Sequence, residues 1–176
     1  MAKKKIFIVP YTSDWKVAFD KEVSILKNAI KEPNVNIEHI GSTSIIDLGA
    51  KPIIDIMIGL QDFNTANNHI NSLEEIGYNY ISKHEDIMPN RRFFTKENNG
   101  RRTHHIHMIE IGTEFWNRHL LFRNYLREHP EDRLRYYQFK KDLAEKDWDD
   151  ENDYADAKTT FIKKIEKKAQ MYPLTE

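Results

Sequence analysis

The chain has 176 residues, the size of one ordinary domain, and its 27 Lys and Arg residues against 28 Asp and Glu residues give a net charge of −1. This balance argues against a basic surface that collects nucleic acid through counterion release. Cysteine is absent, which excludes disulfides, thiolate nucleophiles and zinc sites with cysteine ligands. Apolar runs are far shorter than the ~20 residues that cross a bilayer, and too few apolar residues precede Pro10 for a signal-peptide core. We therefore expect one cytoplasmic domain over residues 1–176, with no membrane partner and with nucleic acid disfavoured.

The first third of the chain changes from a helical period to a strand period. Apolar residues at three- and four-residue steps predict an amphipathic helix from its N-cap Ser13 to about residue 30. Alternation over 35–40 predicts a strand that ends at the turn Gly41-Ser42. The run 53–60 is rich in β-branched residues and is typical of a central strand buried on both faces.

The remaining elements follow from the same patterns. We expect a helix over 62–76, strands over 78–81, 92–95 and 104–111, and helices over 115–126, 130–143 and 152–169. The turn-forming sequence Asn98-Asn99-Gly100 predicts that the last two strands form a hairpin. Trp148-Asp149-Asp150-Glu151 is interpreted as an acidic linker between helices. This order predicts the α+β class with a helical C-terminal third.

The segment 38–44, Glu-His-Ile-Gly-Ser-Thr-Ser, carries the most informative chemical pattern. A Gly-Ser turn after a strand lets backbone N–H groups and hydroxyls approach a phosphate, because glycine has no Cβ in the way. Lys51 follows, and Asp55 on the next strand should face the turn. A carboxylate there could hold Mg²⁺ against the same phosphates. The simpler alternative is an ordinary turn, with Asp55 hydrogen-bonded to nearby backbone.

Strand parity predicts which side chains share a face with Asp55. Because side chains alternate, Met57 lies on the same face as Asp55, and the isoleucines at 54, 56 and 58 lie on the core face. Methionine is a poor Mg²⁺ ligand, so the second carboxylate of an Asp-x-Asp pair is missing.

The same parity places His105 and His107 on one face of their strand and Ile106 on the other. If Ile106 is core, both histidines point toward Asp55. Two imidazoles beside a carboxylate can ligate a transition metal or shuttle protons near neutral pH. The alternative is a pair of histidines hydrogen-bonded to neighbours on the sheet surface.

Basic residues cluster around these strands, and two of them stand out. Arg123 and Arg127 are four residues apart on one face of a predicted helix and could reach a common anion. Guanidinium groups match phosphate oxygens bidentately, so both are candidates for binding a phosphorylated ligand. Exposed surface positions are the simpler interpretation for the other arginines.

These motifs together resemble the GrpB family over nearly the whole chain. The likeness rests on segments 38–44 and 50–56, then on Pro10-Tyr11, Trp15, 105–107, 122–127, Tyr136 with Lys140, Tyr154 with Lys158, and Phe161-Ile162. The resemblance implies a nucleotidyltransferase-like fold, also called DNA polymerase beta-like, in which helices flank a mixed sheet. A homologous domain is fused to dephospho-CoA kinase in some bacteria, which suggests nucleotide or coenzyme metabolism.

The resemblance also implies roles for individual positions. Gly41 and Ser42 match the phosphate turn of the superfold, and Asp55 matches its first metal carboxylate. Met57 departs from the pattern at the second carboxylate. The sequence also departs at 45–47, where Ile-Ile-Asp replaces a common Val-Pro-Gly, and at 124, where Asn replaces Asp.

We therefore expect a nucleotidyltransferase-like protein that binds a nucleotide or another phosphorylated small molecule with Mg²⁺ or Mn²⁺. Transfer of a nucleotidyl group to a small acceptor is one expected activity. The alternatives are a non-catalytic phosphate-binding module, because two-metal transfer needs both carboxylates, and a mononuclear metal hydrolase. The acceptor, the base preference and the oligomeric state stay open. The predicted site residues are Gly41, Ser42, Thr43, Lys51, Arg123 and Arg127 for phosphate, Asp55 and His107 for metal, and Asp55, His105 and His107 for catalysis.

Overall fold

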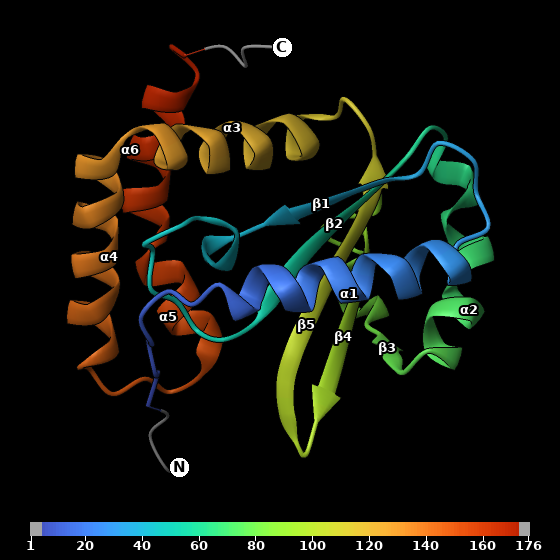
Figure 1. The fold of residues 1–176 in the computed structure, drawn as a ribbon, viewed down its shortest axis with the longest axis horizontal. Coiled ribbons are helices and arrows are strands. Elements are labelled where there is room, and N and C mark those ends of the chain that lie inside the picture. Colours follow the sequence, from blue (N-terminus) through green and yellow to red (C-terminus); the bar gives the residue numbers. More distant parts are fainter. Residues whose placement is uncertain (1–4, 173–176) are drawn as a thin grey trace.

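A computed structural model of the chain describes residues 5–172, and within them a five-stranded sheet has helices on both faces (Figure 1). The strand order is β1-β2-β5-β4-β3. β2 and β5 run parallel and the other neighbours run antiparallel, so the sheet is mixed. The strands are β1 (Asn36–Ile40), β2 (Ile54–Leu60), β3 (Tyr78–Tyr80), β4 (Arg92–Asn98) and β5 (Arg101–Glu110).

The helices form two layers and a group at one end of the sheet. α1 and α2 cover one face, α3 lies on the other, and α4, α5 and α6 gather on the left in Figure 1. The α-helices are α1 (Asp14–Ala29), α2 (Ile70–Glu75), α3 (Glu114–Glu128), α4 (Pro130–Ala144), α5 (Glu151–Ala157) and α6 (Thr159–Ala169), and the 3₁₀ helices are η1 (Ser42–Ser44), η2 (Phe63–His69) and η3 (Ser82–His84). The predicted α+β class with a helical C-terminal third is confirmed. Within residues 5–172, no helix combines the length and apolarity that crossing a membrane requires.

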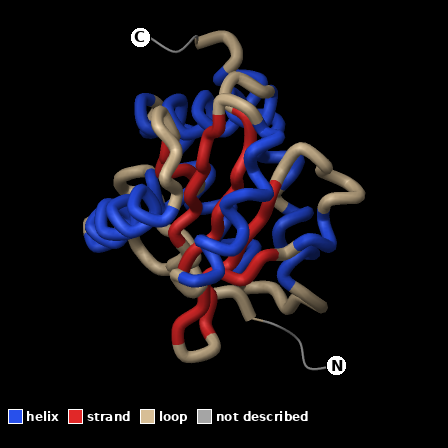
Figure 2. Tube along the Cα trace, turned by 90° about the vertical axis from the view of Figure 1, so that its right-hand side faces the viewer, coloured by secondary structure: helices blue, strands red, loops and turns tan. Residues whose placement is uncertain are grey.

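The predicted hairpin joins β4 and β5. Asn99 and Gly100 have φ values of 51° and 72°, as expected for a two-residue turn with both residues in the left-handed region. Both strands continue to this turn and are longer than predicted. Figure 2 shows the hairpin projecting beyond the body of the molecule.

Two predicted helices differ from the structure. The helix expected over 62–76 begins as η2. There the Asp62 side chain accepts from the backbone N–H of Asn64 at 2.9 Å, and the Thr65 hydroxyl donates to the Asp62 carbonyl at 2.8 Å. Such local side-chain bonds of aspartate and threonine compete with the α-helical pattern. The helix expected over 152–169 is divided at Lys158 into α5 and α6.

Two predictions about helix ends also need correction. Ser13 makes no capping bond with its side chain, and Thr12 Oγ1 instead accepts from the Asp14 backbone N–H at 3.3 Å. Asp150, assigned to an acidic linker, is the N-cap of α5 and forms a capping box with Asp153. A carboxylate that bonds first-turn N–H groups therefore ends the linker earlier than its composition indicated.

The sheet separates two apolar layers as strand parity predicted. On the α1 side, the isoleucines of β2 pack with Trp15, Leu26, Ile106 and Met108. On the α3 side, Met57 is fully buried and packs with Ile40, Ile109 and Trp116. The position of the missing second carboxylate is therefore part of the core.

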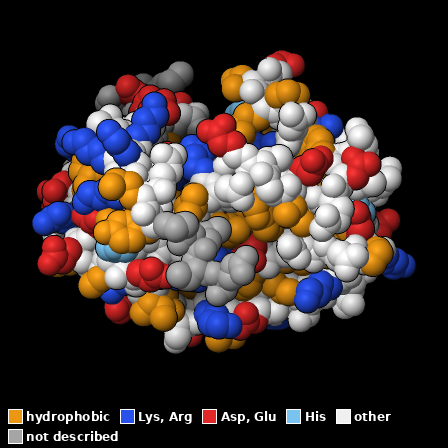
Figure 3. All heavy atoms as spheres, turned by 90° about the horizontal axis from the view of Figure 1, so that it is seen from above, with side chains coloured by type: hydrophobic (Ala, Val, Ile, Leu, Met, Phe, Trp, Pro, Cys, Tyr) orange, Lys and Arg blue, Asp and Glu red, His pale blue; other side chains and the backbone are white. Residues whose placement is uncertain are grey.

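Charged side chains of both signs are spread over the face shown in Figure 3. Lysine and arginine side chains are most crowded on the left of that view, the side on which α4 and α6 lie in Figure 1. The C-terminal helical region is nevertheless almost neutral, because residues 130–172 contain 10 Lys and Arg residues and 11 Asp and Glu residues.

The burial of Met57 yields a stability prediction. Met57→Ala should lower the free energy of unfolding by about 2–5 kcal/mol, because it leaves a cavity beneath Trp116. Met57→Leu conserves volume and should cost less than about 1.5 kcal/mol. Urea unfolding monitored by circular dichroism measures both, and a negligible cost for the alanine variant would contradict a core role.

Candidate functional site

The site is organised where β1 ends beside β2. Ile40, the last residue of β1, is the register partner of Asp55. Gly41 follows with φ 70° and ψ −177°, a combination that essentially only glycine adopts. A Cβ at Gly41 would lie 2.4 Å from Asp55 Oδ2. The absence of a side chain at Gly41 therefore lets the carboxylate sit directly against the turn, as the sequence predicted.

Asp55 and His105 form a partly buried pair on the parallel strands β2 and β5. His105 Nδ1 lies 3.1 Å from Asp55 Oδ1, with the two side chains 19% and 29% exposed. Burial alone would raise the pKa of Asp55, but the hydrogen bond from His105 and the nearby charge of Lys158 hold this pKa below its usual value. Asp55 is therefore ionised at neutral pH.

His107 occupies different surroundings from His105. Its ring packs against those of Phe93 and Phe115, with centroids 5.1 and 5.6 Å away, and Arg91 Nη1 lies 3.4 Å from His107 Nδ1. Burial lowers the pKa of His107 to about 3, so the ring is neutral. The two histidines share a face as predicted, but the hydrogen bond to Asp55 comes from His105 alone among the described residues.

A cavity of about 190 Å³ lies beside the Gly-Ser turn, and we call it the lysine cavity. Segments from the sheet and from the C-terminal helices enclose it. Its lining residues are Ile8, Ser42, Thr43, Ala50, Lys51, Ile53, Asp55, His105, Lys140, Tyr154 and Lys158. The predicted residues Ser42, Thr43, Lys51, Asp55 and His105 thus come together as the sequence indicated.

Lys140, from α4, is the most deeply buried cation of this cavity. It is 2% exposed, and its Nζ donates to Ser42 Oγ at 2.9 Å and to the Gly49 carbonyl at 2.5 Å. Burial, with a smaller effect from Lys158, lowers the pKa of Lys140 to about 6. Burial and then Lys51 lower the pKa of Lys158 to about 8. The cavity therefore holds two lysines whose charged forms are disfavoured by burial, beside a single lining carboxylate.

Sequence reasoning gave Lys140 and Lys158 no function, although both belong to the family resemblance. Each follows a buried tyrosine by four residues, Tyr136 and Tyr154. A lysine on the apolar stripe of a helix is unusual, because lysine is almost never fully buried without a partner. A lysine four residues after a tyrosine on an apolar helix face was therefore the feature of the sequence that could have identified these two residues.

Two polar atoms of this cavity's lining residues are buried without a hydrogen-bond partner. Within the described part of the chain, they are the Tyr154 hydroxyl and His105 Nε2. Buried polar groups are normally satisfied, so such orphans suit a site that receives a polar ligand.

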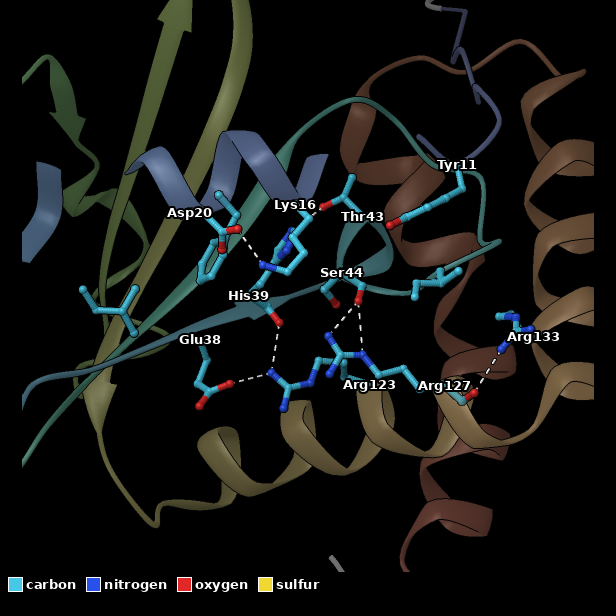
Figure 4. Close-up of a pocket in the computed structure, with 13 residues that line it drawn as sticks. Tyr11, Lys16, Asp20, Glu38, His39, Thr43, Ser44, Arg123, Arg127 and Arg133 are labelled. Atoms are coloured by element: carbon cyan, nitrogen blue, oxygen red, sulfur yellow. Dashed lines mark hydrogen bonds and ion pairs between the residues drawn. The ribbon is translucent and has the colours of Figure 1, made fainter. Parts of the chain in front are cut away.

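Arg123 and Arg127 lie elsewhere. They line a second cavity of about 490 Å³ that shares Thr43 with the first, and we call it the arginine cavity (Figure 4). Arg123 Nη1 donates to Glu38 Oε2 at 2.6 Å and to the His39 carbonyl at 3.0 Å. Arg127 donates twice to the Ser44 carbonyl, at 3.2 and 2.8 Å. The predicted phosphate ligands are thus divided between two cavities.

The donor set does not fit a resident divalent metal. Among the described residues, no group of three or more His, Asp or Glu side chains is placed to hold a metal ion. Asp55 is the single carboxylate among the residues that line the lysine cavity, where it faces three lysines. Divalent cations of the Mg²⁺ type need several oxygen ligands, so the protein residues alone do not form such a site.

Comparison with known proteins places these features in a family. A sequence model described as GrpB protein matches residues 5–168. The UPF0157 protein YqkA of Bacillus subtilis is 39% identical over 97% of this chain, which spans about half (49%) of YqkA. Glutamate-rich protein GrpB of Alkalihalophilus pseudofirmus is 36% identical over 93% of this chain and 95% of its own length.

Solved structures agree with the sequence comparisons. The crystal structure of the conserved protein GrpB from Enterococcus faecalis superposes with a TM-score of 0.82 at 38% identity, covering 93% of this chain and 96% of that one. The Cid1 poly (U) polymerase with bound MgGTP gives a TM-score of 0.51 at 13% identity, over 76% of this chain and 43% of its own. That likeness shows a nucleotidyltransferase-like fold and nothing about activity.

The contact between Gly41 and Asp55 can be tested with a matched glycine. Gly100→Ala introduces a Cβ at φ +72° with nothing within 4 Å, so it should cost about 1–2 kcal/mol of unfolding free energy through backbone strain alone. Gly41→Ala should cost at least about 1 kcal/mol more, because its backbone conformation is closed to alanine and its Cβ also displaces Asp55. In an Asp55→Ala background, part of this excess should disappear. Equal costs for the two glycine variants would contradict the close contact.

The buried histidines predict acid destabilisation. Burial lowers the pKa of His107 to about 3 and the pKa values of His39 and His119 to about 4. Below about pH 6.5 these histidines are protonated in the unfolded chain but stay neutral in the native chain. The free energy of unfolding therefore falls by about 1.4 kcal/mol per pH unit for each such histidine. His107→Phe should make the loss between pH 6 and pH 4 shallower by about that amount. Urea unfolding at several pH values measures the slope, and an unchanged slope would refute the prediction.

Proposed function

This chain belongs to the GrpB family, and we propose that it binds a nucleotide or another phosphorylated small molecule in the lysine cavity. The observation that carries the proposal is the placement of the buried Lys140 and of Lys158 with one carboxylate, Asp55, in the lining of the cavity beside the Gly-Ser turn. A phosphate group would supply the negative charge that this arrangement lacks.

The burial of Lys140 supports the same conclusion through its energetics. A buried ammonium group without a carboxylate partner is unfavourable, and the lowered pKa of Lys140, about 6, reflects that cost. A strongly perturbed titratable group in a cavity favours a functional site over a purely structural one. An anionic ligand would restore the charged form of the lysine.

The lysines can neutralise a phosphate chain without a metal held by the protein. If Mg²⁺ or Mn²⁺ takes part, the phosphates of the ligand would have to supply most of its oxygen ligands, and Asp55 would be its one carboxylate from the protein. His105 then acts as a positioning residue, because its hydrogen bond to Asp55 fixes the orientation of that carboxylate. His107, packed between aromatic rings, is left with a structural role in this proposal.

Nucleotidyl transfer to a small acceptor is the second candidate function. The ionised Asp55 against the glycine turn favours it, whereas the buried Met57 opposes a two-metal mechanism, which needs carboxylates bridging both ions. Incubation with α-³²P-labelled nucleotides and Mg²⁺ or Mn²⁺ separates the two functions. Label in a small acceptor supports transfer, and tight binding without label supports a binding module.

Binding in the lysine cavity should depend on Lys140. Lys140→Met should weaken the binding of inorganic triphosphate by about tenfold or more, because a charge-assisted hydrogen bond contributes about 1.5–3 kcal/mol. Lys141→Met, an exposed neighbour on the same helix, serves as the control and should change affinity less than about twofold. Isothermal titration calorimetry measures both affinities.

The same titrations also measure how many protons the protein takes up when the anion binds. At pH 8 the free Lys140 is neutral, since its pKa is about 6, and an anion raises that pKa, so binding should take up protons and weaken as the pH rises. Titration in buffers of different ionisation enthalpy should show about one proton fewer for Lys140→Met than for the wild type. Equal affinity and equal proton uptake in the two proteins would overturn the proposal.

A further inference from the structure

We propose that the arginine cavity is a second, separate binding site, which takes a small phosphate monoester whose dianion is carried on an aromatic or apolar body. Nothing in this proposal requires the lysine cavity to bind a ligand.

The size and construction of the cavity suit a small molecule. Its volume of about 490 Å³ falls within the range of small-ligand sites. Figure 4 shows its walls: Lys16 and Asp20 come from α1, Glu38 and His39 from the end of β1, and the arginines at 123 and 127 from α3 on the opposite side. Several rigid elements therefore define one concave site.

The charge of the lining favours an anion. Four cations face two carboxylates, an excess of two: Lys16, Arg123, Arg127 and Arg133 against Asp20 and Glu38. Two of the cations are already paired, Lys16 with Asp20 at 2.5 Å and Arg123 with Glu38 at 2.6 Å. Arg133 lies 3.6 Å from Asp47, whose side chain is 72% exposed and offsets only part of its charge.

Arg127 is the cation best prepared for a ligand. Its Nε and Nη2 donate to the Ser44 carbonyl, which holds the guanidinium plane in place without neutralising it. Within residues 5–172, its Nη1 has no hydrogen-bond partner, which leaves three of its five N–H donors, two on Nη1 and one on Nη2, for ligand oxygens. A pre-oriented guanidinium loses less conformational entropy on binding than a mobile one.

The remaining wall is apolar and uncharged. Phe19 stacks on the His39 ring with centroids 4.6 Å apart, and Tyr11 and the 62% exposed Ile46 complete the lining. Burial lowers the pKa of His39 to about 4, so its imidazole is neutral at physiological pH. An aromatic or apolar body could pack against this wall while its phosphate meets Arg127.

Thr43 connects the two cavities. Its hydroxyl donates its one hydrogen to the Ile53 carbonyl at 3.1 Å, so the 3.0 Å contact with His39 Nε2 must be a bond donated by the histidine. Thr43 lines both cavities. Ligands in the two cavities would therefore lie on either side of η1.

Phenyl phosphate is the probe that tests the second site, with neutral benzyl alcohol as its uncharged analogue. Calorimetric titration of the full chain should show binding of phenyl phosphate and none of benzyl alcohol. Arg127→Gln should weaken phenyl phosphate by about tenfold or more, through loss of a charge-assisted bond. Glu38→Gln should strengthen it, because this substitution removes negative charge from the same wall. If Arg127→Gln and Glu38→Gln both weaken the binding of phenyl phosphate, the substitutions distort the site, and the inference from charge is wrong.

A measurement on the wild-type protein keeps the test independent of variant folding. Nitrogen-15 NMR of arginine Nε–Hε groups should show the Arg127 signal moving with phenyl phosphate. If phenyl phosphate does not bind, the proposal of a second site is wrong. It is also wrong if Lys140→Met abolishes the binding of phenyl phosphate while Arg127→Gln leaves it unchanged. Phenyl phosphate binding without triphosphate binding would overturn the proposed function and leave the second site standing. Triphosphate binding without phenyl phosphate binding would overturn the second site and leave the proposed function standing.

Discussion

The approach of Gly41 to the Asp55 carboxylate is the contact on which both cavities depend. It needs a residue without a Cβ in a backbone conformation that other residues avoid. Because η1 follows at once, the position of Gly41 determines where Ser42 and Ser44 lie. Ser42 then accepts a hydrogen bond from Lys140, and the Ser44 carbonyl accepts two from Arg127. One glycine therefore sets the positions of the two acceptors that cations on α4 and α3 contact.

The two cavities hold their cations by different means. Lys140 is buried against a hydroxyl and a carbonyl, and its pKa falls to about 6 because no carboxylate compensates its charge. Arg127 stays charged, because guanidinium resists deprotonation, and it is tied to a carbonyl. Binding of a phosphate in the lysine cavity would consequently be accompanied by proton uptake, whereas binding in the arginine cavity would not. The difference follows from residue type, since lysine adapts its protonation to burial and arginine does not.

Local periodicity explains what the sequence could predict. Alternation along β2 and β5 correctly placed Asp55 and His105 on one face and the isoleucines on the other, because the two-residue period needs no knowledge of distant contacts. Lys140 contacts Ser42 across 98 positions of sequence, so its role depends on how α4 docks. The helical spacing of Arg123 and Arg127 was equally sound, but the cavity that they line depends on where α3 lies, which spacing does not reveal.

Met57 shows why this chain departs from a two-metal site in more than one residue. Its side chain packs under Trp116 and beside Ile109, and the neighbouring Gly59 leaves no room for a Cβ because Trp116 lies 2.5 Å from where it would be. A carboxylate at 57 would be desolvated in an apolar layer and would be driven toward its neutral form. A carboxylate at position 57 would therefore require α3 to repack. Lys158, whose pKa is about 8, instead places a positive charge near Asp55 without a change in the apolar layer around Met57.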